Sequence, residues 1–409
     1  MDFYNKYYEG IFWLSDNEDN KIISTLYIDE RGIATITSLK PFREDENVTK
    51  KWNKENLVFG YINSNDKSQT YSIKLYDVYK THQTIGSLTK YKYQSNNSFI
   101  FSGYDNDIKI SIYNTILLSS DLINNWIPIT GFNFKSEIEN TFKISQLYEQ
   151  PQRIELFKNN DFDIYLFFRA SSGSQGRRNS YIKENIFINI ECNKSFEIKE
   201  LFKIKTVIER LFNILLFIPF YSNIIEFRTD ENKAYSVIKK NNILSSTTGK
   251  KINFSVFREN SQNIISNWLD KQEKLELVIL NFFSVYGQKG VLVENKFLTY
   301  ISILENYHKN NINNKGYLKS RLNYLLEKSS INSKINDIEN YAEKLKITRN
   351  YHAHLEEKHK EKSLNTNEII KTNILLEFVI REIFLRELEI DENSQVSSVL
   401  NEYLKSLND

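Results

Sequence analysis

Apolar and polar residues alternate in several stretches between the N-terminus and about residue 195. A period of two indicates antiparallel strands with one buried face. Two hairpins are predicted, one joining SFIF to DIKISIY through SGYDND and the other joining RIELF to DIYLFF. The alternation is clearest in TYSIKL, with Tyr71, Ile73 and Leu75 against Ser72 and Lys74, and in DIKISIY, with Ile108, Ile110 and Ile112 against Lys109 and Ser111.

The pattern changes to a helical period later in the chain. A buried helix is predicted over IKELFKIKTVIERLFNILLF, before Pro219, and two short strands, NIIEFRT and KAYSVIKK, follow it. From about Ser261 the patterned stretches are helical, and Gly287 marks the expected end of the first. We therefore predict an α+β fold, with a β-rich antiparallel N-terminal region followed by an all-α helical bundle. The predicted regions are 1–258, which can divide further into 1–145 and 146–258, and the helical region 259–409.

Composition and charge narrow the class of protein. A net charge of +2 over 409 residues does not fit a constitutive nucleic-acid coat, so RNA or DNA would bind at a local patch. The single cysteine, Cys192, excludes internal disulfides and cysteine zinc sites, and its apolar neighbours in IFINIEC predict a core thiol. The start of the chain lacks a signal-peptide pattern, and the longest apolar stretch, LFNILLFIPFY, is too short to span a membrane. We expect a cytoplasmic protein without a membrane partner.

Two polar stretches contain residue types that also occur in phosphate sites. The stretch SSGSQGRRNS carries Arg177 and Arg178, and SSTTGKK carries Gly249 but lacks the upstream glycine of a phosphate-binding loop. Both are predicted to be solvated loops. Four aromatic residues are expected in the core or at its rim rather than as stacking platforms for bases, namely Trp13, Trp52, Trp126 and Trp268.

A cluster of polar and charged residues, KITRNYHAHL, continues an amphipathic pattern near the C-terminus. The apolar stripe predicts one face of a helix, and its next two positions are Arg349 and His352. A guanidinium on a buried face needs a partner, because its desolvation is costly. Either the helix end emerges into solvent there, or Arg349 lies in a polar site shared with a partner. The stripe consists of Ile331, Ile335, Ile338, Ala342 and Leu345.

Helical geometry limits how this cluster can act. Arg349 and His354 point about 140° apart on an ideal helix, so aiming both at one phosphate needs an irregular turn or two copies facing each other across a dimer axis. His352 and His354 point about 200° apart and cannot chelate one metal there. His359, in EEKHKEK, is predicted to be solvated charge. Because no nearby carboxylate has a convincing ligand spacing, we expect no metal site.

Arg349, Asn350 and His354 form the pattern R-N-x-x-x-H late in a helical region. This pattern resembles the motif of HEPN domains, which are compact helical ribonuclease domains that dimerise and form a composite site. The stretch ISILENYHK, with Glu305 and His308, resembles the helix that precedes the motif in that superfamily. The resemblance predicts that the helical region is a HEPN domain.

The N-terminal stretch YEGIFWLSDNEDNKIISTLYIDERGIATITSL resembles the start of ApeA proteins. These are bacterial anti-phage proteins with a β-rich N-terminal domain and a C-terminal HEPN domain. Ser24 stands where that family usually has glycine, and WIPITGFNF, from Trp126, is similar to a later aromatic segment. The resemblance covers both ends of the chain and is consistent with its middle. Its most specific element, G-x-F-W-L, is present as Gly10, Phe12, Trp13 and Leu14.

The resemblance implies a reaction without metal or cofactor, in which the RNA 2′-oxygen attacks the adjacent phosphorus and expels the 5′-oxygen. His354 would move a proton, since an imidazole exchanges protons near neutral pH. Arg349 would hold the phosphoryl charge with two donors, and Asn350 would orient the phosphate or the histidine. Candidate supporting residues are Glu305, His352 and Tyr351. Glu305 would be either a helix-surface residue or a partner of Arg349. For His352, packing at the dimer interface is preferred to a role as a second proton carrier.

The resemblance thus implies an anti-phage endoribonuclease acting in abortive infection. RNA is the expected substrate, with tRNA as one candidate. The HEPN domain is expected to form a homodimer or a higher even oligomer. The β-rich region would sense a phage-derived trigger or restrain the nuclease until infection. The alternative is a non-catalytic protein, in which a β-rich sensor is joined to a helical dimerisation domain that binds protein or nucleic acid.

Overall fold

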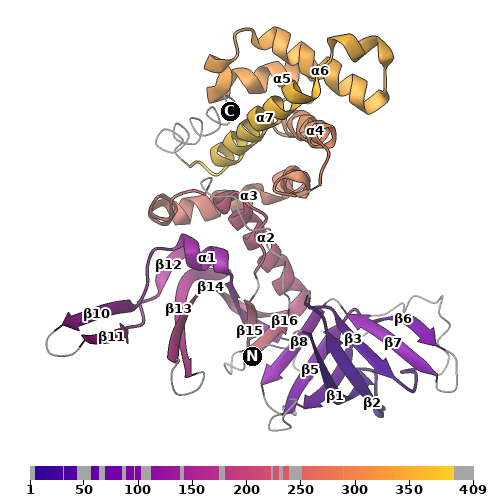
Figure 1. Cartoon of the computed structure of the whole chain (residues 1–409), viewed down its shortest axis with the longest axis vertical. Helices are drawn as coiled ribbons and strands as arrows, with labels where there is room; N and C mark the ends of the chain where they lie inside the picture. The colour runs from indigo at the N-terminus through magenta and orange to yellow at the C-terminus, as the bar shows by residue number, and fades with distance from the viewer. Residues whose placement is uncertain are drawn as a thin grey trace. The chain divides into compact units, whose positions relative to one another are not determined.

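A computed structural model gives the fold of this chain, and Figure 1 shows its helices and strands. Contacts between Cα atoms divide the chain into two compact units, a β-rich one and a helical one. The predicted α+β class, with antiparallel strands before a helical region, is confirmed. The β-rich unit contains residues 1–205 and 221–242, and the helical unit contains 206–220 and 243–409. The structure describes residues 5–30, 32–43, 57–63, 70–84, 89–95, 97–102, 112–138, 142–174, 180–222, 224–229, 234–238, 251–288 and 290–390.

The β-rich unit is built on one large antiparallel sheet. Within the described residues, this sheet has 14 strands in the order β12-β13-β14-β9-β15-β16-β8-β5-β4-β1-β2-β3-β7-β6, and β10 pairs with β11 separately. The strands are β1 (Lys6–Leu14), β2 (Asn17–Ile28), β3 (Ala34–Ser38), β4 (Val58–Asn63), β5 (Thr70–Tyr76), β6 (Tyr79–Thr84), β7 (Lys90–Ser95), β8 (Asn97–Ser102), β9 (Ile112–Ser119), β10 (Phe132–Ile138), β11 (Phe142–Tyr148), β12 (Ile154–Lys158), β13 (Phe162–Ser174), β14 (Ser180–Glu197), β15 (Ile224–Arg228) and β16 (Ala234–Ile238), with the short helix α1 (Asp121–Trp126) after β9.

One predicted hairpin is confirmed, and most of the other lies outside the described residues. RIELF and DIYLFF pair as β12 and β13. Of DIKISIY only Ile112 and Tyr113 are described, and they begin β9, which lies between β14 and β15, whereas β8, which contains SFIF, lies between β5 and β16. The hairpin of β15 and β16, which comes more than 100 residues later, is inserted between β9 and β8. Residues 103–107 of the turn SGYDND and residues 175–179, with Arg177 and Arg178, lie outside the described residues, as does Gly249.

Strand β5 is buried on both faces, which corrects the prediction that it is half-buried. Ser72 and Lys74 are as buried as their apolar neighbours, and Lys74 is only 1% exposed. On the second face the Lys74 ammonium lies 5.8 Å from the centroid of the ring of Phe59, its partner on the neighbouring strand β4. Ammonium groups are attracted to aromatic faces, so this contact partly offsets the desolvation of the charge.

The residues of the G-x-F-W-L element hold β1 between its two neighbouring strands. Gly10 lies opposite Ser24 of β2, and a Cβ added at Gly10 would come within 2.3 Å of the Tyr61 carbonyl oxygen of β4. Glycine therefore allows β1 and β4 to approach at this point. Three of the four tryptophans are buried as predicted, and the fourth, Trp52, lies outside the described residues.

The predicted buried helix before Pro219 is confirmed as α2 (Ile198–Leu216), whose apolar residues from Leu211 onward are buried. Cys192 is buried in β14, and burial raises the pKa of its thiol to about 11, as expected for a core thiol rather than a nucleophile. Among the residues that the structure describes, no helix is both long and apolar enough to cross a membrane.

The helical unit continues with a bundle in which α4, α5, α6 and α7 lie side by side (Figure 1). The first long helix begins before the predicted position and ends two residues before Gly287, which has a φ of +71°. The elements are α3 (Phe254–Val285), α4 (Val293–Asn311), α5 (Leu318–Glu327), η1 (Ser330–Lys334), α6 (Ile338–His354), η2 (Glu357–Lys362) and α7 (Thr366–Glu387). The bundle core includes Trp268, Phe282, Tyr300, Leu304, Leu345, Leu376 and Phe384.

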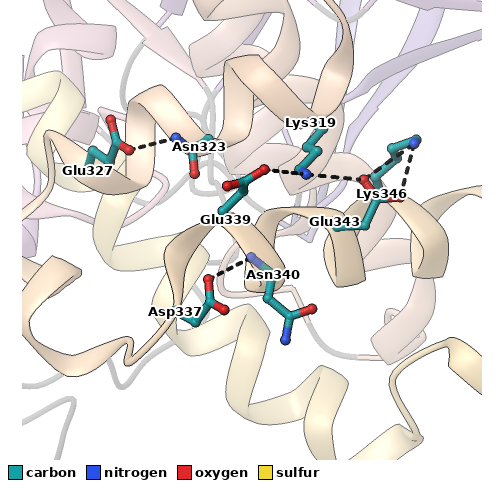
Figure 2. A network of polar contacts seen from close by, with 8 residues as sticks. All are labelled: Lys319, Asn323, Glu327, Asp337, Glu339, Asn340, Glu343 and Lys346. Carbon is teal, nitrogen blue, oxygen red and sulfur yellow. Dashed lines mark hydrogen bonds and ion pairs between the residues drawn. The ribbon is translucent and has the colours of Figure 1, made fainter.

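Helix α6 is shorter than the apolar stripe predicts. Ile331 lies in the separate 3-10 turn η1, and Ile335 lies between the two elements. The helix begins only at Ile338, because the Asp337 side chain accepts a hydrogen bond from the Asn340 N–H (3.0 Å) and caps it there. Figure 2 shows this cap beside a surface ion pair of 2.8 Å between Lys319 of α5 and Glu339 of α6.

Candidate active site

The last turn of α6 brings Arg349 and His354 into contact within one chain. One guanidinium nitrogen of Arg349, Nη1, lies 3.0 Å from Nε2 of His354 and 3.3 Å from Oδ1 of Asn350. Arg349 and Asn350 are half-buried, whereas His354 is exposed at the end of the helix. The three residues of the R-N-x-x-x-H pattern therefore form one connected polar cluster.

The contact with Arg349 determines which role Nε2 of His354 takes in the hydrogen bond. A guanidinium carries only donors, so the 3.0 Å contact requires a lone pair on Nε2 of His354. The same nitrogen of Arg349 donates to the Asn350 side-chain oxygen, so Asn350 orients the arginine rather than the histidine. His354 thus presents a basic nitrogen that is covered by a cationic donor.

This contact joins two residues that an ideal helix places on different sides. The two backbone positions do diverge on the helix, but the flexible arginine side chain covers the distance to the ring of the last helical residue. Leu355 then takes a left-handed conformation, with φ of +53°, and its N–H donates to the Tyr351 carbonyl (2.7 Å). Convergence of the pair does not require a second copy of the chain.

Thr348 fastens the segment after the helix back onto α6. Its side chain is fully buried, donates to the Lys344 carbonyl (2.8 Å) and accepts from the Leu364 N–H (2.9 Å). The chain that turns back at Leu355 is therefore tied to the helix one residue before Arg349. The sequence interpretation missed this residue, although a threonine inside a helix often bonds the carbonyl four residues earlier.

Replacing Thr348 by valine is expected to lower the free energy of unfolding of the helical unit by about 1–3 kcal/mol, because it leaves the buried Leu364 N–H without its acceptor. Thr348→Ser keeps the hydroxyl and should lose less. Urea unfolding of the three proteins measures the difference. Equal stability of the valine variant and the wild type would contradict the anchoring role.

Glu305 does not pair with Arg349. It lies on α4 and its Oε1 is 3.3 Å from Nη1 of Arg321, while Nη2 of Arg321 donates to the Asn314 carbonyl (3.0 Å). Arg321 is buried, so this arrangement clamps the turn between α4 and α5. The proposed pairing of Glu305 with Arg349 is therefore wrong, because a nearer guanidinium takes the carboxylate.

His308 is a buried neighbour of this clamp. Its ring meets the edge of Tyr324, with ring centroids 5.1 Å apart, and its Nδ1 has no hydrogen-bond partner among the described residues. Desolvation lowers the pKa of His308, and the charge of Arg321 lowers it further, against a backbone hydrogen bond with Asn313 that raises it. His308 is therefore a core histidine.

The helical unit is expected to lose stability as the pH falls below about 6.5, the usual imidazole value. Because folding lowers the pKa of His308, the unfolded chain takes up this proton first, and stability present above that pH is lost as the pH falls toward the folded pKa. Urea unfolding over a pH series should show a shallower decline for His308→Gln than for the wild type. Parallel declines would assign the pH dependence to other groups.

Two further histidines near the end of α6, His352 and His359, differ in their surroundings. His352 is half-buried, stacks edge-on with Tyr351 at 4.9 Å between ring centroids, and has a buried Nε2 without a partner among the described residues. His359 is not simply solvated charge, because its Nε2 lies 3.1 Å from Oε2 of Glu356 and its side chain is only 23% exposed. Within the described ranges, no group of three or more His, Cys, Asp or Glu side chains is placed to hold a metal ion.

Family models match both the N-terminal and the C-terminal part of the chain. Residues 298–394 match the family model described as Apea-like HEPN, and residues 7–268 match that of ApeA N-terminal domain 1. The fold and the matches thus define a protein with a β-rich N-terminal region and a C-terminal HEPN domain. Because the N-terminal match covers more than half of the chain, the chain belongs to the ApeA family. No curated protein and no solved structure matches it.

The family match confirms the predicted resemblance and gives the general function. The chain is a HEPN-containing anti-phage defence protein. HEPN domains are usually nucleases, generally bind RNA and often dimerise. The motif residues Arg349, Asn350 and His354 lie inside the matched HEPN region, as does Glu305.

Proposed function

We propose that this protein is a metal-independent endoribonuclease whose active site contains Arg349, Asn350 and His354. The observation that carries the proposal is the direct contact between the Arg349 guanidinium and the lone pair of His354. A base and a phosphate-binding cation lie within 3.0 Å of each other, at an exposed helix end that RNA can reach. No cofactor takes part in the proposed reaction.

The cleavage follows from the donors and acceptors of this cluster. A phosphate of the RNA takes hydrogen bonds from the Arg349 guanidinium and draws it away from His354, which frees the lone pair on Nε2. Nε2 then accepts the proton of the 2′-hydroxyl as the 2′-oxygen bonds to phosphorus and the bond from phosphorus to the 5′-oxygen breaks. The products are a 2′,3′-cyclic phosphate and a 5′-hydroxyl. Asn350 holds the guanidinium through its side-chain oxygen.

We also propose that the protein works as a homodimer or a higher even oligomer through its HEPN domain, with two motifs facing one RNA. Light scattering at concentrations that cleave RNA should give an even multiple of the mass of the 48.5 kDa chain. A strictly monomeric protein that cleaves RNA at full rate would contradict a composite site. That result would still be compatible with the contact between Arg349 and His354, because both residues belong to one chain.

The β-rich region is proposed to sense a phage-derived trigger, or to restrain the nuclease until infection, in the cytoplasm. Residues 7–268 match a domain separate from the HEPN domain, which supports a division of labour between trigger and cleavage. tRNA is one candidate substrate.

Sequencing of RNA ends from phage-infected cells tests the function directly. Cells carrying the wild type should accumulate new 5′-hydroxyl ends at defined RNA positions, and cells carrying His354→Ala at equal protein level should not. Identical RNA ends in both cultures, while only the wild type protects, would indicate a function of His354 other than cleavage. Equal protection by both proteins without new ends would favour the non-catalytic alternative of a sensor with a binding and dimerisation domain.

A further inference from the structure

The segment after α6 holds a second imidazole in a defined position. Leu355 reverses the chain, and Thr348 holds the far end of the segment by accepting from the Leu364 N–H. Between these two points the 3-10 turn η2 packs against α6. The side chains of residues 356–362 are therefore carried beside the helix end that bears His354.

Glu356 and His359 form a pair within this turn. Oε2 of Glu356 lies 3.1 Å from Nε2 of His359 and 2.9 Å from Nζ of Lys358. The His359 backbone N–H also donates to the Glu356 carbonyl (2.8 Å), so the two residues are connected through both main chain and side chain. The imidazole retains an accessible surface, since 23% of it is exposed.

The hydrogen-bond partners of His354 and His359 differ in whether they require a lone pair or a hydrogen on Nε2 of the ring. The carboxylate of Glu356 only accepts, so Nε2 of His359 carries a hydrogen. The guanidinium of Arg349 only donates, so Nε2 of His354 carries a lone pair. The hydrogen bond and the charge of Lys358 lower the pKa of Glu356, which keeps this carboxyl group ionised beside His359.

Transesterification of RNA needs two proton transfers, one from the 2′-hydroxyl and one to the departing 5′-oxygen. The proposed function uses His354 for the first and leaves the second without a protein donor. An imidazolium whose Nε2–H is held by a carboxylate can release its other proton, from Nδ1, without losing its orientation.

We propose that His359, held by Glu356, donates a proton to the leaving 5′-oxygen in the RNA cleavage proposed above, on which this inference rests. As the bond from phosphorus to the 5′-oxygen breaks, its electron pair takes the Nδ1 proton of His359. His354 has meanwhile gained the 2′-hydroxyl proton, so the numbers of protons and electrons balance. Glu356 is a positioning residue, since it acts through the imidazole.

A substrate with a sulfur leaving group separates this role from a structural one. Two RNAs are compared that are identical except at the mapped cleavage site, where one has sulfur in place of the bridging 5′-oxygen. A thiolate leaves without prior protonation far more readily than an alkoxide, so the sulfur RNA needs no acid. Full-length protein purified from infected cells is assayed on both.

His359→Gln is expected to cleave the oxygen RNA at least about 100-fold more slowly than the wild type, and the sulfur RNA within about tenfold of it. Glu356→Gln should likewise slow cleavage of the oxygen RNA more than cleavage of the sulfur RNA. His354→Gln should be slow on both RNAs, because it removes the base. Lys360→Gln is the matched control, since Lys360 lies in the same turn and pairs with the exposed Glu357, and both rates should be unchanged.

Equal slowing of His359→Gln on both RNAs, or no slowing on either, would overturn the assignment while wild-type cleavage upheld the proposed function. Failure of the wild type to cleave either RNA would overturn the proposed function and this inference with it. Thermal unfolding of each variant detects a folding defect. Misfolding lowers the cleavage rates of both RNAs equally, whereas loss of the acid slows cleavage of the oxygen RNA alone.

Discussion

His354→Gln is expected to lower RNA cleavage by about 10²–10⁴-fold and to abolish protection against phage. Glutamine keeps polar atoms near Arg349 but cannot take up a proton at Nε2. Because His354 is exposed and ends its helix, the free energy of unfolding should change by no more than about 0.5 kcal/mol. The loss should therefore appear in the rate and not in the amount of folded protein.

Cleavage rates and unfolding curves of purified wild type and His354→Gln test this expectation. The matched control is His82→Gln, which changes an exposed histidine of the β-rich unit and should leave the rate unchanged. A His354→Gln protein that cleaves at the wild-type rate would remove His354 from the chemistry. A similar loss in His82→Gln would point to a general effect of histidine replacement.

Arg349→Lys is expected to lose about 10²–10³-fold in cleavage rate, although the charge is kept. The guanidinium of Arg349 reaches His354 and Asn350 with one nitrogen and has further N–H donors for a phosphate. A lysine ammonium is a point charge without the planar fork, so it cannot hold the phosphate with two parallel bonds in the same orientation.

Arg321→Lys is the matched control for this change, because it makes the same replacement at a buried arginine outside the motif. Arg321 clamps Glu305 and the Asn314 carbonyl, so its variant should unfold more easily but cleave at the normal rate per folded molecule. Near-normal protection by Arg349→Lys at equal protein level would contradict the phosphate-clamp role of Arg349.

Local patterns predicted most of the elements but not all of their pairings. The period of two found β5 and β12, and the helical period found α2 to α7. Strand order was not predictable in the same way, because β15 and β16 pair with strands that lie more than 100 residues earlier in the chain. Burial of Lys74 was missed because alternation describes one covered face, whereas tertiary packing covers both faces of β5.

The contacts within the candidate site could not be predicted from the sequence pattern. The R-N-x-x-x-H spacing selected Arg349, Asn350 and His354 as candidates, but angles on an ideal helix did not predict that Arg349 and His354 contact each other within one chain. Side-chain length decided that contact. Glu356 and Thr348 were missed because their partners, His359 and the Leu364 N–H, lie on a turn that doubles back on α6, and helical periodicity does not describe such a turn.

We propose that this protein cleaves RNA without a metal ion through Arg349 and His354. Analysis of the ends of a cleaved RNA, with purified full-length protein in excess chelator, tests it most directly. We expect undiminished cleavage that leaves a 2′,3′-cyclic phosphate and a 5′-hydroxyl, and none of these products with His354→Gln. Cleavage that stops in chelator, or that leaves a 5′-phosphate and a 3′-hydroxyl, would contradict it.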